Sequence, residues 1–330
     1  MQRRAFLRYF GAGASAAFEC WKGSSADAAQ GHTASGNAGK PPAVSPRRHA
    51  APAVPNKLDQ ICISSRCLHN YFRGTRDDDC NLPGPMLALL DFPDLVAGRY
   101  KVRHFEFCST HFASATLPYL QELRYALVRT RSTVVNIPVD IEECGSDGTF
   151  SDPDPKARQA ALDAAKGWVD VAHVLGARSV RVAPGKVDGE NLTPTVESYR
   201  SLSNYALAKG IRVVVENQGG FGSENPEDLV KLFKLVGAGR IGALPNLGNF
   251  PDQPTREQGL KLLFPYAPTV CHAKALSFDA VGSEAKYDFP PAIAIARKGG
   301  FRGVYSIEFE GPGDPYAGIQ ETLDELLKYL

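Results

Sequence analysis

The stretch from Ile211 to Leu244 has the sequence IRVVVENQGGFGSENPEDLVKLFKLVGAGRIGAL and contains a complete strand–helix–strand unit. Both ends are short runs of β-branched or other apolar residues, which are typical of buried strands. Between them, NPED at 225–228 supplies an N-cap, a proline at the first helical position and acidic residues in the first turn. This order of elements favours parallel strands that are joined by a crossover helix.

The same alternation extends outward from this unit over residues 57–330. Strands are predicted at 60–64, 102–108, 133–138, 179–183, 211–216, 241–244, 269–273 and 304–309. Helices are predicted at 85–97, 113–129, 155–175, 195–209, 226–236, 255–264, 290–298 and 316–329. Eight such units predict an α/β fold, a single-domain (β/α)₈ TIM barrel, which typically needs about 250 residues. An open doubly wound sheet is the alternative, but the first predicted strand is followed by SSRC at 64–67 and not by a glycine-rich phosphate loop.

The residues before the predicted barrel have a different character. Arg3 and Arg4, followed by Phe6 and Leu7 and a weakly hydrophobic stretch, are typical of a bacterial twin-arginine signal peptide. Small residues at 26–28 suit cleavage by a signal peptidase, so residues 1–28 are predicted to direct export to the periplasm. Residues 29–56 are rich in Gly, Ala, Ser and Pro and are predicted to form a disordered linker.

The composition narrows the class of partner. The 330 residues are 22% charged with a formal net charge of +1, without the strong basic excess that is usual in nucleic-acid-binding proteins. No apolar run approaches the roughly 20 residues that span a bilayer, so stable membrane insertion is not expected.

Polar side chains close four successive predicted strands. Glu216 ends the fifth strand, Asn246 follows the sixth, His272 lies in the seventh and Glu308 lies in the eighth. In an α/β barrel the carboxyl ends of the strands meet at one mouth. Two facing carboxylates repel each other, and burial adds to the cost, so a cation between them would relieve both problems. The pattern predicts one divalent ion in a site of oxygen ligands and one imidazole, which suits Mn²⁺, Mg²⁺, Co²⁺ or Zn²⁺.

Four segments carry a resemblance to a known family: VVENQ at 214–218, LGNF at 247–250, CHAK at 271–274 and YSIEFEG at 305–311. They resemble the sugar phosphate isomerase/epimerase family of the xylose isomerase-like TIM barrel superfamily. The resemblance runs from about residue 57 to the C-terminus, and the second half carries most of it. Members of this family hold one divalent metal with Glu, Asp, His and Glu from strands five to eight. The resemblance therefore implies metal ligands at Glu216, Asn246, His272 and Glu308.

Position 246 departs from this pattern, because the family usually has Asp where this chain has Asn246. An amide brings no charge, so we expect either weaker binding of a hard cation or loss of the metal. Asp252, six residues further on, would compensate if its loop folded back toward the site.

Further residues are expected around the pocket. Lys274, Arg181, Asn249 and His111 are predicted to bind the substrate. Glu106 is expected to be structural, with Arg181 as a candidate partner inside the barrel. The loops at 65–81, 109–115 and 139–152 are expected to determine specificity.

The resemblance implies a metal-dependent sugar isomerase or epimerase that works through an enediolate, with Glu216 and Glu308 as acid and base. The expected partner is a small-molecule carbohydrate, unphosphorylated because no phosphate-binding motif is evident; an oligomer is possible. Two alternatives stay open: an exported carbohydrate-binding barrel with a degenerate metal site, and a dehydratase acting on a keto-sugar or polyol. An abasic-site endonuclease is disfavoured, because that group needs a three-zinc cluster and residues 57–330 contain only five histidines.

Overall fold

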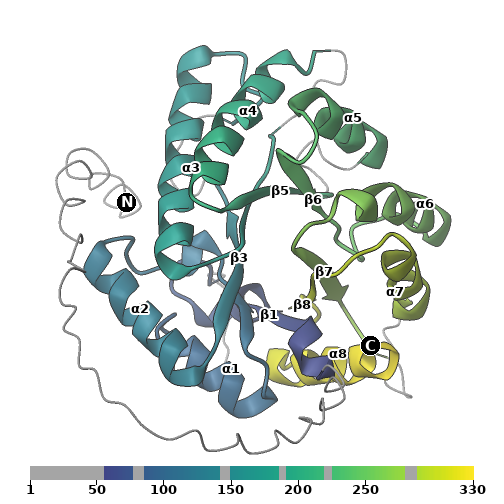
Figure 1. Cartoon of the computed structure of the whole chain (residues 1–330). Coiled ribbons are helices and arrows are strands. Elements are labelled where there is room, and N and C mark those ends of the chain that lie inside the picture. Colours follow the sequence, from purple (N-terminus) through teal and green to yellow (C-terminus); the bar gives the residue numbers. More distant parts are fainter. Residues whose placement is uncertain (1–55, 77–84, 142–148, 186–190, 219–224, 279–287) are drawn as a thin grey trace, which may run out of the picture.

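The computed structural model describes residues 56–76, 85–141, 149–185, 191–218, 225–278 and 288–330. Within them, parallel strands curl into a barrel and helices form a ring outside it (Figure 1). The strands are β1 (Ile61–Ser64), β2 (His104–Glu106), β3 (Thr133–Val139), β4 (Ser179–Val182), β5 (Arg212–Glu216), β6 (Ile241–Leu244), β7 (Val270–Ala275) and β8 (Val304–Phe309). The helices are α1 (Phe92–Tyr100), α2 (Leu117–Thr130), α3 (Pro155–Leu175), α4 (Thr193–Ala208), α5 (Pro226–Val236), α6 (Gln253–Leu263), α7 (Phe289–Lys298) and α8 (Pro315–Tyr329). The predicted (β/α)₈ barrel is confirmed.

The first two helices begin later than the sequence predicted. α1 begins at Phe92 and α2 at Leu117, whereas the predicted starts were residues 85 and 113. The second residues of these helices are Pro93 and Pro118. Proline lacks a backbone N–H and is tolerated only in the first turn of a helix, so each proline fixes the start close to itself. α3 and α5 have the predicted bounds.

The barrel closes at a seam between β6 and β7. The order of hydrogen-bonded strands is β6-β5-β4-β3-β2-β1-β8-β7, so among the described residues the two terminal strands share no full ladder. An isolated bridge between Asn246 and His272 joins them. In this bridge the backbone N–H of His272 donates to the carbonyl of Pro245, and that of Leu247 donates to the carbonyl of His272. Two of the four predicted metal ligands therefore lie at the closure of the barrel.

Apolar side chains fill two separate regions. The larger core packs the helices against the outer surface of the strands. A smaller cluster takes one residue from each of six strands: Cys62, Val135, Val214, Leu244, Val270 and Val304. Six strands of one barrel can meet only in its interior, so this cluster is the apolar floor beneath the polar residues of the mouth.

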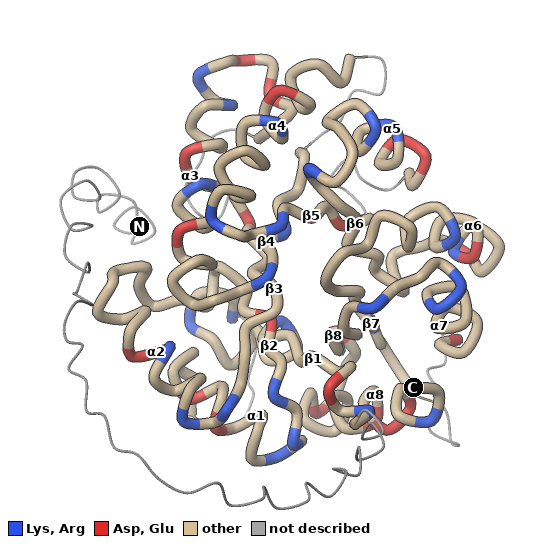
Figure 2. The backbone as a smooth tube through the Cα atoms, in the orientation of Figure 1, with Lys and Arg blue, Asp and Glu red and all other residues tan. Residues whose placement is uncertain are grey.

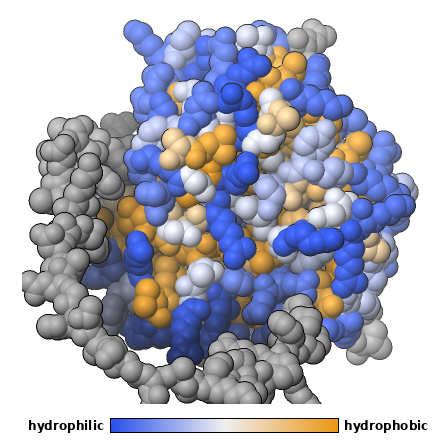
Figure 3. All heavy atoms as spheres, in the orientation of Figure 1, coloured by the Kyte–Doolittle hydropathy of each residue, from blue (hydrophilic) through white to orange (hydrophobic). Residues whose placement is uncertain are grey.

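The outer surface is polar. Lys and Arg alternate with Asp and Glu around the ring of helices, in keeping with the small net charge (Figure 2). In the space-filling view of the same side, hydrophilic residues predominate and hydrophobic ones are interspersed among them (Figure 3). Within the described ranges, no helix combines the length and apolar character needed to cross a bilayer. The predicted signal peptide at 1–28 and residues 29–55 of the predicted linker lie outside the described residues, so both stay predictions.

Candidate active site

A cavity of about 470 Å³ lies at the carboxyl ends of the strands. Five of the predicted site residues line it: Arg181, Glu216, Asn249, Lys274 and Glu308. Residues that follow the first three strands also contribute, among them Arg66, Asp140 and Thr149, in line with the expectation that these loops shape the pocket. Residues 77–84 and 142–148 of those loops lie outside the described residues.

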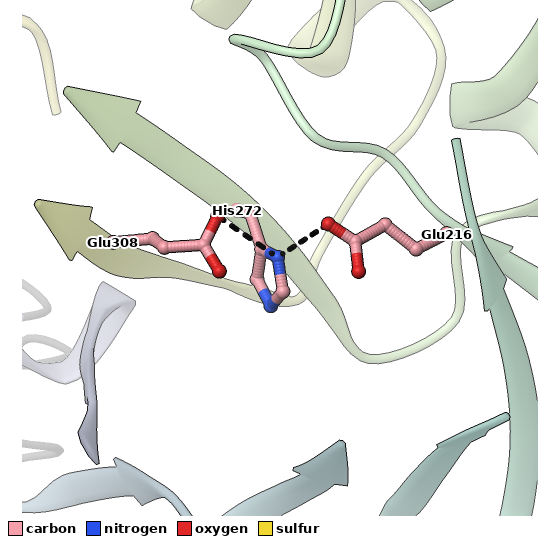
Figure 4. Close-up of side chains that lie close together, drawn as sticks. All are labelled: Glu216, His272 and Glu308. Carbon is pink, nitrogen blue, oxygen red and sulfur yellow. Dashed lines mark hydrogen bonds and ion pairs between the residues drawn. The ribbon is translucent and has the colours of Figure 1, made fainter. Parts of the chain in front are cut away.

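Glu216, His272 and Glu308 form a compact buried group on the wall of this cavity (Figure 4). The Nδ1 atom of His272 lies 3.0 Å from Glu216 Oε1 and 3.5 Å from Glu308 Oε2. One ligand atom from each residue lies within 4.8 Å of the others. The nitrogen–oxygen distances of 3.0 and 3.5 Å suit a divalent cation held by two carboxylates and an imidazole, since ligand atoms at about 2.1 Å from one ion lie at most roughly 4.2 Å apart.

Asn246 inserts its amide group among these three residues. Its Nδ2 atom donates to Glu216 Oε1 and to Glu308 Oε2, both at 2.8 Å, and lies 3.4 Å from His272 Nδ1. Its Oδ1 atom accepts the backbone N–H of Gly248 at 2.9 Å. A backbone N–H cannot bond the NH₂ end of an amide, so Gly248 fixes which end of Asn246 faces the carboxylates. Asn246 therefore does not fit as a metal ligand in this arrangement.

The opposite edge of the His272 ring contacts Glu106. The distance from His272 Nε2 to Glu106 Oε1 is 2.8 Å, and Asn136 Nδ2 donates to Glu106 Oε2 at 2.9 Å. Glu106 does not pair with Arg181, which had been a candidate partner in the sequence. Arg181 instead contacts Asp140 at 3.0 Å and Glu216 at 3.2 Å. Both carboxylates lie at the carboxyl ends of the two strands beside β4, nearer the mouth of the barrel than Glu106.

The buried charges of this group perturb one another. Burial alone would raise the pKa of Glu216, but the positive charges on His272 and Arg181 outweigh it and lower the pKa to about 2. Burial raises the pKa of Glu308 to about 7, and the negative charge of Glu216 adds to this effect against the opposing influence of His272. Burial would lower the pKa of His272, but the surrounding carboxylates, Glu106 foremost, raise it well above its usual value.

Charged pairs surround the cavity above this group. Lys274 Nζ lies 2.5 Å from Glu310 Oε2, and Arg66 Nε lies 3.1 Å from Glu310 Oε1. Glu310 is thus a cavity residue held by two cations. Asn249 Nδ2 donates to the carbonyl of Asn217 at 3.0 Å and so presents its side chain beside Glu216.

His111 and Asp252 do not reach the cavity. The ring of His111 is buried, stacks on Phe72 with centroids 4.0 Å apart, and bonds Ser65 at 2.8 Å and Thr75 at 3.0 Å. These contacts favour a structural role, and its predicted substrate contact stays untested. The expectation that Asp252 would compensate for Asn246 is wrong, because Asp252 is the exposed N-cap of α6 and accepts the N–H of Thr255.

Comparison with known proteins agrees with the barrel fold. The family model described as xylose isomerase-like TIM barrel matches residues 97–329. The chain belongs to this family. No curated protein matches the sequence at a significant level.

Solved structures of this family resemble the chain over most of its length. A D-tagatose 3-epimerase-like protein is 16% identical with a TM-score of 0.62, covering 82% of this chain and 97% of that one. A xylose isomerase-like TIM barrel protein from Mycobacterium smegmatis, solved in complex with magnesium, is 17% identical with a TM-score of 0.60, covering 81% and 95%. The 3-keto-D-glucoside 4-epimerase from E. coli is 14% identical with a TM-score of 0.60, covering 82% and 99%. At these identities the likeness establishes the fold.

Three residues beside the site were not among the site residues predicted from the sequence: Glu106, Asp140 and Arg66. Glu106 ends β2 and Asp140 directly follows β3, so the rule that identified Glu216 and Glu308 also applies to them. Arg66 follows β1 by two residues and reaches the cavity from the 3₁₀ helix at Ser65–Tyr71. Polar side chains at or just after the carboxyl end of every strand, and not only of the last four, are therefore candidates for the site.

Proposed function

We propose that this protein is a sugar isomerase or epimerase whose Glu216 and Glu308 exchange protons with a carbohydrate in the cavity. The supporting observation is that these two carboxylates lie on either side of His272 Nδ1 and both line one cavity. Moving a proton on a carbon next to a carbonyl needs a base on one side and an acid that returns the proton. Two glutamates from β5 and β8 meet this requirement.

The cavity suits a polyhydroxylated ligand. Cationic donors and anionic acceptors lie together around it: Arg66 and Lys274 both pair with Glu310, and Arg181 pairs with Asp140 and Glu216. Sugar hydroxyls both donate and accept, so they can replace the contacts within such pairs. Lys274, Arg181 and Asn249 are proposed to bind the hydroxyls and fix which carbon faces the two glutamates. The absence of a phosphate-binding motif in the sequence favours an unphosphorylated sugar.

A single divalent ion, Mn²⁺, Mg²⁺, Co²⁺ or Zn²⁺, is proposed to bind Glu216, His272 and Glu308. When bound, it would supply Lewis-acid polarisation of the carbonyl beside the reacting carbon. The three protein ligands fit this role, but the NH₂ group of Asn246 contacts the same carboxylate oxygens. Asn246 must give up these two hydrogen bonds when an ion binds, so we expect weaker binding than with Asp at this position.

A second function is favoured by the same contacts of Asn246. If its amide excludes the ion, the barrel becomes an exported carbohydrate-binding protein with a degenerate metal site. A dehydratase acting on a keto-sugar or polyol shares the proton chemistry and differs in the loss of water. Export and the periplasmic location are proposed from the twin-arginine pattern of residues 1–28 alone.

Hydrogen exchange into sugars tests the proposal directly. The protein without residues 1–28 would be incubated in D₂O with Mn²⁺ or Mg²⁺ and a panel of unphosphorylated ketoses and aldoses, followed by NMR. Deuterium incorporation beside a carbonyl, together with a new isomer, supports an isomerase or epimerase. A new product lacking one water indicates the dehydratase. Ligand-induced stabilisation without exchange indicates a binding protein and would refute the proposed catalysis.

A further inference from the structure

A buried chain of hydrogen bonds leads from the wall of the barrel to His272. Thr269 Oγ1 and Ser179 Oγ lie 3.0 Å apart, and Ser179 Oγ donates to Asn136 Oδ1 at 2.8 Å. Asn136 Nδ2 then donates to Glu106 Oε2 at 2.9 Å, and Glu106 Oε1 lies 2.8 Å from His272 Nε2. The members come from four strands or strand ends and are all buried. They cross the interior of the barrel behind the candidate active site.

The donor and the acceptor of each hydrogen bond around Glu106 are fixed. The Asn136 carbonyl oxygen is used by Ser179, so the NH₂ end of Asn136 faces Glu106. As a carboxylate, Glu106 is an acceptor at both oxygens and offers no hydrogen to the ring. The ring nitrogen that faces it must therefore carry the hydrogen, which places an N–H on Nε2 of His272. The other nitrogen, Nδ1, faces Glu216 and Glu308, and any hydrogen that it carries must leave when an ion binds there.

We propose that Glu106 and Asn136 are positioning residues that hold the hydrogen of His272 on Nε2 and thereby direct Nδ1 at the carboxylate cluster. One part of the inference rests on the proposed function, namely that Nδ1 is the atom that binds the ion. A carboxylate behind a metal-binding histidine fixes both the tautomer and the orientation of the ring, and loss of such a partner typically costs about 10–100-fold in metal affinity. Packing alone does not require this polarity of the hydrogen bonds.

Two nearly isosteric variants separate hydrogen-bond direction from packing. In Glu106→Gln, the fixed NH₂ of Asn136 requires the Gln oxygen to face it, so the Gln NH₂ faces Nε2. The ring must then accept at Nε2 and carry its hydrogen on Nδ1, toward the carboxylates. In the double variant Glu106→Gln with Asn136→Asp, the new carboxylate accepts from the Gln NH₂, and the Gln oxygen again faces Nε2–H. The double variant therefore restores the wild-type direction of the hydrogen bond from His272 Nε2 to position 106. It has the same net charge as the wild-type pair.

The first measurement is the affinity for Mn²⁺ or Zn²⁺ alone, by calorimetric titration of all three proteins, with thermal melts of the metal-free forms as a check of folding. We expect Glu106→Gln to lose about 10–100-fold in affinity and the double variant to recover most of it. Equal affinities in a wild type that binds the ion and in Glu106→Gln would overturn the inference. A double variant that melts like the wild type and binds no better than Glu106→Gln would also overturn it.

The second measurement is the ¹⁵N–¹H correlation of histidine-labelled, metal-free protein, which needs neither an ion nor a substrate. We expect a protected, downfield Nε2–H signal from His272 in the wild type and the double variant, and its loss or upfield shift in Glu106→Gln. A wild type that binds no ion but shows this signal refutes the metal part of the proposed function and leaves the inference standing. A wild type without the signal overturns the inference, whatever the metal result.

Discussion

The amide nitrogen of Asn246 lies 2.8 Å from Oε2 of Glu308, a position at which an aspartate would place a charged oxygen. The same nitrogen contacts Glu216, so one uncharged group satisfies two carboxylates that would otherwise repel each other. Together with the imidazole of His272, this amide accounts for the close burial of the two glutamates.

Replacing this amide by a carboxylate is expected to strengthen metal binding. Asn246→Asp keeps the acceptor for Gly248 and exchanges the NH₂ for an oxygen ligand, which raises the number of charged ligands. We expect at least a roughly 10-fold gain in affinity for Mn²⁺ by titration calorimetry. Without metal, three adjacent carboxylates should lower the free energy of unfolding by roughly 2–4 kcal/mol.

Asn249→Asp provides the matched control for this change. It introduces the same charge beside the cluster, but Asn249 bonds mainly the carbonyl of Asn217 and makes only a long contact with Glu216. Its gain in metal affinity should be much smaller. Equal gains in both variants would mean that added charge, and not a new ligand at position 246, is responsible.

Loss of either proposed proton carrier should abolish turnover. Glu216→Gln and Glu308→Gln are each expected to lower kcat for a confirmed sugar about 10²–10⁴-fold, because the amide cannot accept a proton. Glu310→Gln is the comparison, since Glu310 lines the same cavity and contacts Lys274 and Arg66 but lies outside the cluster. It should raise KM with a much smaller effect on kcat. Unchanged turnover in both cluster variants would exclude them as acid and base.

The metal-free protein should lose stability as the pH rises from 5 to 8. The pKa of Glu308 is raised from 4.5 to about 7, so its contribution to stability is present below 4.5 and is lost as the pH approaches 7. His272, whose pKa is also raised, acts in the same direction at higher pH. Glu216, at about 2, does not titrate in this range.

Denaturant unfolding of chelator-treated protein at pH 5 and pH 8 measures this effect. The wild type is expected to lose on the order of 2–3 kcal/mol more than Glu308→Gln over the interval, given about 1.4 kcal/mol for each unit of pKa. Parallel losses in the two proteins would show that Glu308 is not the titrating group.

Lys274 and His111 were both predicted to bind substrate, and the structure separates them. Lys274→Met is expected to raise KM about 10-fold with little change in kcat, because Lys274 lines the cavity and pairs with Glu310, outside the cluster of Glu216, His272 and Glu308. His111→Phe should keep the stacking on Phe72 and lose two hydrogen bonds, lowering stability by roughly 1–3 kcal/mol without changing KM. A raised KM in a stably folded His111→Phe protein would support the predicted substrate contact of His111.

The sequence was sufficient for the architecture because the strand–helix alternation is a local pattern. The predicted helix starts were wrong where a proline lay inside an expected helix, as at Pro93 and Pro118, because proline has no N–H to donate and is confined to the first turn. The four strand-end residues Glu216, Asn246, His272 and Glu308 were brought together as predicted, because the carboxyl ends of parallel strands share one mouth.

Partners within the site were harder to predict, because they depend on depth in the barrel. Glu106 and Glu216 both close strands, yet Arg181 contacts only the second, and Glu106 lies behind His272. A register shift between Phe105 and Glu106 contributes to this placement and leaves no mark in the spacing of the sequence. The orientation of the Asn246 amide likewise depends on one backbone N–H, that of Gly248.

The seam between β6 and β7 has a consequence for protein engineering. The backbone hydrogen bonds across it come from Pro245, Leu247 and His272, and the Asn246 side chain adds to the local backbone through Oδ1, which accepts the Gly248 N–H. A substitution at position 246 that keeps the acceptor for the Gly248 N–H, as aspartate does, can therefore change the chemistry of the site while the seam keeps its backbone hydrogen bonds. The preference of the site for one ion over another can then be adjusted by a single substitution, and the barrel around it does not need to be redesigned.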